Sequence, residues 1–266
     1  MTPGANDLVI IFQLATVTFF IGLLIGFVGA GGAGVAVAIL TTVFSLPVHT
    51  AIGTAIAAML FVTVSGAISH YREGNVASGL GLVVGLAGAA GAVLGADSSQ
   101  TVSDRTLGIA AGLALWCLSA LVWVRTHIAS GVPADREQPW LGGPARSPRE
   151  WAAGIGLGAA GGAAAAFFGV GMAPFLQLGL LTVHHLPLRQ TIGTTMLILV
   201  FISAAGGLAM ARHGDVSGPH LIGLTIGLAS GAYIGARFTR RAPSGILRGA
   251  IVTIPFVAGA MLLFLR

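Results

Sequence analysis

This sequence has little charge and no lysine. Only 8% of its 266 residues are charged, and its mean hydropathy is +0.93. A soluble domain carries about 25% charged residues, so a chain this poor in charge cannot cover a surface that faces water. The abundant Val, Ile, Leu and Ala side chains must face lipid instead. The composition therefore predicts an all-α integral membrane protein.

All 13 basic residues are arginine, and the formal net charge is +5. Nucleic-acid binding would require these arginines to form a basic patch or stripe. They lie instead at the ends of apolar runs, which is how the loops of membrane proteins carry charge. We therefore expect contact with a lipid bilayer and no nucleic-acid partner.

Residues for catalysis or metal binding are also scarce. Cys117 is the one cysteine, so it cannot form an internal disulfide and has no partner at metal-ligand spacing. The sequence shows no Ser/His/Asp spacing, HExxH or CxxC motif. We therefore expect no enzymatic activity, no metal and no cofactor.

Carboxylates are absent from the centres of the apolar segments. Glu73, Asp97, Asp104 and Asp215 all lie at segment ends, which argues against a carboxylate proton relay through the core. A pathway lined by backbone N–H groups, Thr, Gln and peripheral Arg fits the sequence better, and such groups attract an anion.

What the sequence does contain is ten apolar segments in two sets of five. Most approach the roughly 20 residues needed to cross a bilayer. The second and seventh are shorter and are either half-helices or parts of re-entrant pairs with the segments before them. The expected segments are Leu8–Val28, Ala30–Phe44, Thr50–Ser69, Val76–Ala96, Thr106–Val124, Trp151–Phe168, Val170–Val183, Thr191–Ala211, Pro219–Ala236 and Ile246–Leu265.

The two sets are copies of each other. Residues 22–96 align without a gap on residues 162–236, and 23 of the 75 pairs are identical. The abundance of Gly and Ala inflates chance matches, but it does not explain matched Pro, Thr and Arg in one register. Secondary transporters are usually built from internal repeats of this kind.

Arginine placement predicts the orientation of the repeats. If all ten segments cross, ten arginines fall on one side, while Arg105, Arg212 and Arg266 fall on the other. The arginine-rich side is then cytoplasmic and both termini are extracytoplasmic. Because five crossings is an odd number, the two halves are inverted. We expect repeats at 1–125 and 151–266, joined by a cytoplasmic linker at 126–150.

A glycine-rich break separates the first two segments of each half. Its copies are Gly29-Ala-Gly31-Gly32-Ala-Gly34 and Gly169-Val-Gly171-Met172-Ala-Pro174. A half-helix that starts at such a break presents free N–H groups and a positive dipole end, which suit an anion. We expect Gly31, Gly32, Gly34, Gly171 and Met172 to contact substrate. Close helix packing without a ligand is the alternative.

A second motif, Pro-x-x-x-x-Ile-Gly-Thr, also occurs twice. Gly53-Thr54 and Gly193-Thr194-Thr195 lie about two turns into the helices that follow the prolines. A Thr hydroxyl can bond a sulfonate or sulfate oxygen without adding charge, although it can instead bond a carbonyl of its own helix. We expect these residues to contribute to the substrate site, together with Gln177, a strongly polar side chain inside the seventh segment.

Three further residues are candidates for a vestibule or a gate. His49 and Arg189 occupy the same repeat position on opposite faces, where either could attract an anion. Arg189 could equally anchor the cytoplasmic face, and His49 could lie in an ordinary loop. His70 ends the third segment and is either a proton-sensitive gate or an interfacial cap.

These motifs resemble those of the TauE/SafE family, also called the toluene sulfonate uptake permease family. The resemblance rests on residues 26–34, on residues 50–54 and on the run from Ser65 to Asn75, with their echoes in the second half. It implies transport of a small sulfur-containing anion, such as sulfite, sulfoacetate or another organosulfonate, across the inner membrane of a prokaryote. The second half departs from the glycine-complete pattern at Met172 and Pro174, which implies an asymmetric site.

The sequence thus favours a secondary transporter that works by alternating access. The alternative is an anion channel or pore without alternating access. Import or export, oligomeric state and coupling to a proton or a sodium ion stay open at this level.

Overall fold

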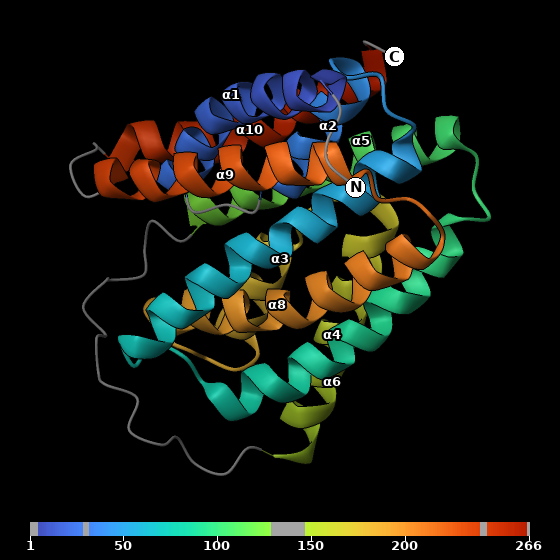
Figure 1. Ribbon diagram of the computed structural model, residues 1–266. Helices are drawn as coiled ribbons and strands as arrows, with labels where there is room; N and C mark the ends of the chain where they lie inside the picture. The colour runs from blue at the N-terminus through green and yellow to red at the C-terminus, as the bar shows by residue number, and fades with distance from the viewer. Residues whose placement is uncertain (1–4, 29–31, 129–146, 240–243, 265–266) are drawn as a thin grey trace.

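The computed structural model describes residues 5–28, 32–128, 147–239 and 244–264, which are drawn in colour in Figure 1. These residues form ten α-helices and no strand, so the predicted all-α class is confirmed. The helices are α1 (Ala5–Val28), α2 (Ala33–Thr42), α3 (Val48–Arg72), α4 (Ser78–Ser99), α5 (Asp104–Ile128), α6 (Pro148–Phe168), α7 (Ala173–Thr182), α8 (Leu188–Arg212), α9 (Gly218–Thr239) and α10 (Ser244–Phe264).

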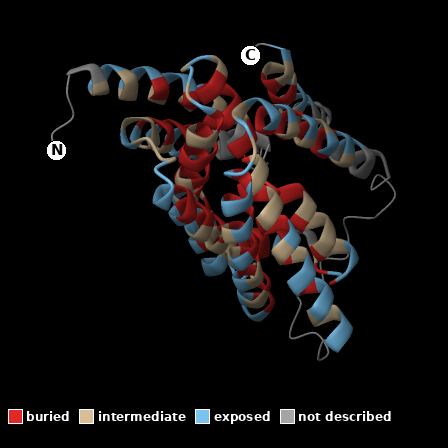
Figure 2. Ribbon diagram, turned by 90° about the vertical axis from the view of Figure 1, so that its right-hand side faces the viewer, coloured by how far each residue is buried: buried red, intermediate tan, exposed pale blue. Residues whose placement is uncertain are grey.

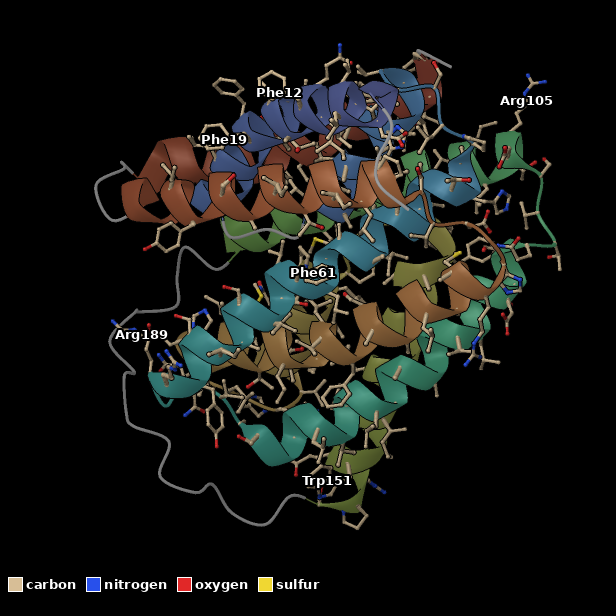
Figure 3. All side chains as sticks on the ribbon, in the orientation of Figure 1. Phe12, Phe19, Phe61, Arg105, Trp151 and Arg189 are labelled. Atoms are coloured by element: carbon tan, nitrogen blue, oxygen red, sulfur yellow. The ribbon has the colours of Figure 1, made fainter. Side chains whose placement is uncertain are left out.

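The described helices include five that are long and apolar enough to cross a membrane. They are α3, α4, α5, α6 and α8. Large apolar side chains are exposed on the outer faces of the molecule, among them Phe12 at 74% and Phe61 at 55% (Figure 3). Buried positions gather where helices face one another (Figure 2). This outside-apolar arrangement is that of a multi-pass membrane protein, because only lipid solvates such a surface favourably.

The sequence offset of 140 residues reappears in the helix boundaries. α2 and α7 begin and end at equivalent residues, and so do α3 and α8. Even an uncommon backbone conformation repeats, because Ser45 and His185 both have positive φ, at 54° and 50°, in the turns that follow α2 and α7. The two copies of the sequence therefore fold locally in the same way.

α2 and α7 are shorter than the sequence predicts. Each has 10 residues, where segments of 14 or 15 residues were expected. α7 begins after the glycines, with Pro174 in its first turn where a missing N–H costs nothing. At 1.5 Å per residue each helix rises about 15 Å, half of the roughly 30 Å hydrocarbon core. Neither helix can cross a bilayer alone.

The expected linker is shorter than predicted at both ends. α5 continues to Ile128, and α6 already begins at Pro148. The start of α6 is a capping box, in which the Ser147 side chain accepts the Glu150 N–H while the Glu150 side chain accepts the Ser147 N–H. The remaining linker residues, 129–146, lie outside the described part of the chain.

Equivalent helices α3 and α8 pack side by side and antiparallel near the centre of the molecule (Figure 1). The start of α3 lies against the turn after α8, and the start of α8 lies against the turn after α3. The outer helices also pack across the two halves. Helix α1 of the first half packs on α9 of the second, and α4 of the first half packs on α6 of the second. Each half therefore completes its packing with helices of the other half.

Glycines allow these crossings to be close. A Cβ at Gly91 of α4 would lie 2.1 Å from the carbonyl oxygen of Ala159 in α6, and a Cβ at Gly231 of α9 would lie 2.1 Å from that of Phe19 in α1. The hydrophobic effect does not drive helices together in lipid, so they associate through close van der Waals packing, which small residues at the interface allow. This accounts for much of the glycine content.

Candidate functional site

Two short helices begin inside the protein. At the start of α2, Gly32, Ala33 and Gly34 are buried, and at the start of α7, Met172 and Ala173 are buried. Neither N-cap, as described, makes a side-chain hydrogen bond. A buried helix start needs partners for its first N–H groups.

The helical hydrogen bonds identify the N–H groups at these two starts that have no acceptor within their own helix. The first intrahelical bond of α2 runs from the Ala36 N–H to the Gly32 carbonyl, and that of α7 runs from the Leu176 N–H to the Met172 carbonyl. The N–H groups of the residues just before Ala36 and Leu176 therefore point out of the N-terminal end of each helix, away from its own carbonyl groups. Within the described α2 and α7, no acidic residue lies in the first turn to oppose the positive dipole end.

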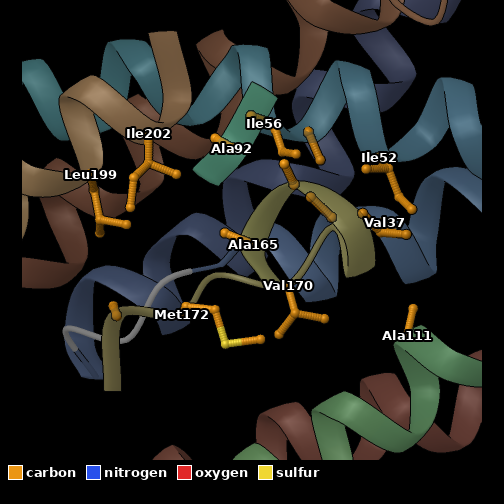
Figure 4. Packing of buried hydrophobic residues seen from close by; sticks show 14 of the residues in the cluster. Val37, Ile52, Ile56, Ala92, Ala111, Ala165, Val170, Met172, Leu199 and Ile202 are labelled. Carbon is orange, nitrogen blue, oxygen red and sulfur yellow. The ribbon is translucent and has the colours of Figure 1, made fainter. Parts of the chain in front are cut away.

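The side chains around the second break are mainly apolar (Figure 4). Val170 and Met172 pack into the same core as Ile52 of α3 and Val37 of α2. Gly169 ends α6 with φ of 67°, and a Cβ there would lie 2.5 Å from Cγ1 of Ile52. Such surroundings have a low dielectric constant, so a dipole that faces them acts more strongly than it would in water.

α6 and α7 form a hairpin, and its turn is this second break. Gly161 of α6 faces Leu176 of α7, and Gly179 of α7 faces Leu157 of α6. The open end of the hairpin brings Gly154 against His184. From Gly154 to Phe168 the helix rises about 21 Å, so the turn lies about that far from the open end of the hairpin.

Gln177 marks a chemical difference between the halves. It holds in α7 the position that Val37 holds in α2. Val37 is fully buried, whereas Gln177 is half-buried. The second half thus places an amide where the first half places an isopropyl group.

The predicted glycines in the first half divide into three cases. Gly31 lies outside the described residues. Gly32 is the N-cap of α2. Gly34 packs against α5, since a Cβ there would lie 2.5 Å from a methyl carbon of Leu115. The contact of Gly34 is therefore explained by helix packing.

The two Gly-Thr motifs lie at the interface between the halves. The Thr54 hydroxyl accepts the Ser217 N–H at 3.0 Å, and the Thr194 hydroxyl accepts the Ala77 N–H at 3.0 Å. Both threonines are fully buried. The contact partners come from the opposite half in each case, and they obey the same offset of 140 residues.

The neighbouring glycines make those contacts close. A Cβ at Gly53 would lie 2.1 Å from the Asp215 carbonyl oxygen, and a Cβ at Gly193 would lie 2.1 Å from the Asn75 carbonyl oxygen. Thr195 differs from its neighbour, because its hydroxyl donates to the Thr191 carbonyl in its own helix at 2.7 Å.

The three candidate vestibule residues lie at two ends of the molecule. His49, in the first turn of α3, contacts the Asp104 carboxylate through Nδ1 and the Ser99 carbonyl oxygen through Nε2, so it is held in place. His70 lies in the last turn of α3, with Nδ1 4.0 Å from Oε2 of Glu73. Arg189 is exposed at the start of α8 (Figure 3).

The sequence analysis missed the turn residues that meet the Gly-Thr motifs. Asn75 and Asp215 occupy the same repeat position, as do Ala77 and Ser217. The matched Gly74 and Gly214 are the sequence signal that could have identified these turns, and both have positive φ in the structure.

Comparison with known proteins finds a matching family model and related membrane proteins. The family model described as "Sulfite exporter TauE/SafE" matches residues 14–262. A "Probable membrane transporter protein YdhB" of Bacillus subtilis (strain 168) is 39% identical over 249 residues, which cover 93% of this chain and 98% of that protein. A "Probable membrane transporter protein" of Xylella fastidiosa (strain Temecula1 / ATCC 700964) is 25% identical over 222 residues, or 83% of this chain and 82% of its own. No solved structure matches.

Proposed function

Because this chain belongs to the sulfite exporter TauE/SafE family and is a multi-pass membrane transporter, we propose that its substrate is a small sulfur-containing anion. Sulfite, sulfoacetate and related organosulfonates are the proposed candidates, and the proposed mechanism is alternating access. The observation that carries the proposal is the pair of buried helix starts at α2 and α7 without a side-chain cap. Such a start binds anions through its N–H groups and its dipole.

The proposed site joins both helix starts. Gly32, Gly171 and Met172 supply backbone around the anion, and Gln177 adds an amide donor from one half alone. Sulfur oxyanions carry several strong acceptor oxygens and need no buried cation if enough N–H groups converge on them. Gly31 belongs to the same proposed site through its place in the sequence motif. The proposal reassigns Gly34, Gly53, Thr54, Gly193 and Thr194 from the substrate to the packing and interface contacts described above.

We also propose that the halves are inverted across the inner membrane of a prokaryotic cell, with both termini outside the cytoplasm. The antiparallel packing of the equivalent helices α3 and α8 supports the inversion. The arginine bias supports the orientation, in which the turn between α3 and α4 is cytoplasmic and the turn between α8 and α9 is extracytoplasmic. A midplane site between two inverted repeats is how many secondary transporters achieve alternating access.

A flux assay in proteoliposomes tests the proposal. We expect sulfite, sulfoacetate or taurine to be taken up, and we expect unlabelled anion inside the vesicles to accelerate uptake of labelled anion. Such counterflow requires a carrier and would exclude the channel alternative. Imposed proton and sodium gradients in the same assay identify the coupling ion. Absence of flux for every sulfur oxyanion would refute the substrate assignment.

A further inference from the structure

Two matched contacts hold the halves together at opposite ends of the α3–α8 pair. One, which we call the outer latch, comprises Gly53, Thr54, Asp215 and Ser217. The other, the inner latch, comprises Gly193, Thr194, Asn75 and Ala77. In each latch a Thr hydroxyl accepts a turn N–H at 3.0 Å.

The distance between the latches matches a membrane. Thr54 lies in the second turn of α3, and the inner latch begins just after α3 ends at Arg72. These eighteen residues of helix rise about 27 Å, close to the roughly 30 Å of a hydrocarbon core. The latches therefore lie near the two ends of the crossing.

Each latch closes only because a glycine is present. The Asp215 carbonyl oxygen and the Asn75 carbonyl oxygen would each lie 2.1 Å from a Cβ on the facing glycine. A real Cβ cannot approach an oxygen so closely, and backbone atoms cannot rotate away as a side chain can. A methyl group at either position must hold its own latch apart.

We propose that the outer and inner latches are the two gates of the transport cycle, an inference that rests on the proposed alternating access. Both are closed in this structure. When one half rocks against the other, one latch separates while its counterpart acts as the pivot. The repeat makes the two gates structurally equivalent, so either side can open by the same motion.

The gates differ in what surrounds them. At the outer latch, Gly53 packs on Met210, and Gln100 donates to the Asp215 carboxylate at 2.7 Å. At the inner latch, the equivalent of Met210 is His70, whose Cβ lies 2.9 Å from the position of a Cβ on Gly193. Gln100, which directly follows α4, therefore ties the turn of the outer gate to the end of that helix.

Thiol accessibility tests the proposal directly. The Cys117→Ser chain has no native cysteine, and Ala173→Cys adds one buried probe at the start of α7. We expect Gly53→Ala to make the probe react with a membrane-impermeant maleimide from the extracytoplasmic side only, at least tenfold faster than in the parent. Gly193→Ala should produce the opposite pattern, with reaction from the cytoplasmic side only.

A matched control separates gating from general damage. Gly91→Ala introduces the same 2.1 Å clash with a backbone oxygen, but between α4 and α6. It should lower stability without favouring either side. If Gly53→Ala or Gly193→Ala fails to fold, Thr54→Val replaces the first variant and Thr194→Val the second. Each should weaken its latch more mildly, and the maleimide should then react at least twofold faster from the corresponding side than from the other. Identical labelling patterns in the outer-latch and inner-latch variants would overturn the gate assignment.

The labelling readout is independent of the substrate. If the Cys117→Ser protein transports no sulfur oxyanion but the two arms label from opposite sides, the gates stand and the proposed substrate fails. If uptake is normal in the Cys117→Ser protein and in both glycine variants, and neither variant shows a side preference, the proposed substrate stands and the gates fail.

Discussion

The Nε2 atom of His213 lies 2.8 Å from the Oδ1 atom of Asp97, and this contact joins the end of α4 to the turn after α8. The two side chains come from different halves of the chain. They lie beside the outer latch, where Gln100 also reaches Asp215. The polar groups that the sequence places at helix ends thus serve partly to connect the halves.

Replacing Asp97 by Asn should lower the free energy of unfolding by no more than about 1 kcal/mol, because both side chains are at least a third exposed and water screens their interaction. The measurement is thermal unfolding in detergent at low and high salt. Asp97→Asn should have no further effect in a His213→Asn background. A loss above about 3 kcal/mol would contradict the screened geometry.

Replacing Thr54 or Thr194 by Val should destabilise the protein by about 1–3 kcal/mol, because the Ser217 or Ala77 N–H then loses its acceptor in a buried interface. Thr→Ser at the same positions keeps the hydroxyl and provides the matched control. Thr63→Val is a second control, since that hydroxyl donates within its own helix. Equal melting temperatures for the Val and Ser variants would show that these bonds contribute nothing.

Gly91→Ala and Gly231→Ala should each cost about 1–3 kcal/mol or more, because the added methyl group overlaps a backbone oxygen of the facing helix. Gly156→Ala should instead be neutral or stabilising by up to about 1 kcal/mol, since nothing lies within 4 Å of its Cβ position and Ala is the better helix former. Thermal unfolding of the purified variants gives this ranking. The packing account fails if Gly156→Ala is the most harmful of the three.

Gln177→Leu should weaken binding of the transported anion about tenfold, which is about 1.4 kcal/mol. The physical reason is loss of an amide donor in a region that is otherwise lined by apolar side chains and backbone. Val37→Leu at the equivalent position of α2 is the matched control and should leave affinity within twofold. The dissociation constant of sulfite, measured by calorimetry, decides the matter, and equal affinity in both variants would remove Gln177 from the site.

Much of the fold is readable from local sequence. Hydropathy predicts the helical membrane class, and the glycine and proline positions locate the breaks between α1 and α2 and between α6 and α7. The starts of helices after Pro47 and Pro187 follow from the fixed φ of proline. The predicted boundaries of α2 and α6 differ from those in the structure by several residues, because the ends of a helix depend on the few residues that satisfy its terminal N–H groups.

The candidate site was less accessible to sequence reasoning. Gly53 and Thr54 look like ligand-binding residues because the glycine leaves space for a ligand beside the threonine hydroxyl. In the fold that room is filled by the turn at Asp215–Ser217, which lies more than 160 residues later in the chain. A single sequence does not reveal which backbone will approach so closely.

Local sequence is enough to predict that this protein is helical, lies in a membrane and is built from two copies of one unit, because hydropathy, helix breaks and repeat spacing are local properties of the chain. How the copies meet depends on the folded arrangement. It paired the start of each central helix with the end of its counterpart, and it gave the two threonine hydroxyls to backbone N–H groups of the opposite half. The physical reason is that a buried hydroxyl bonds whichever partner packing brings within about 3 Å, and packing depends on the whole chain.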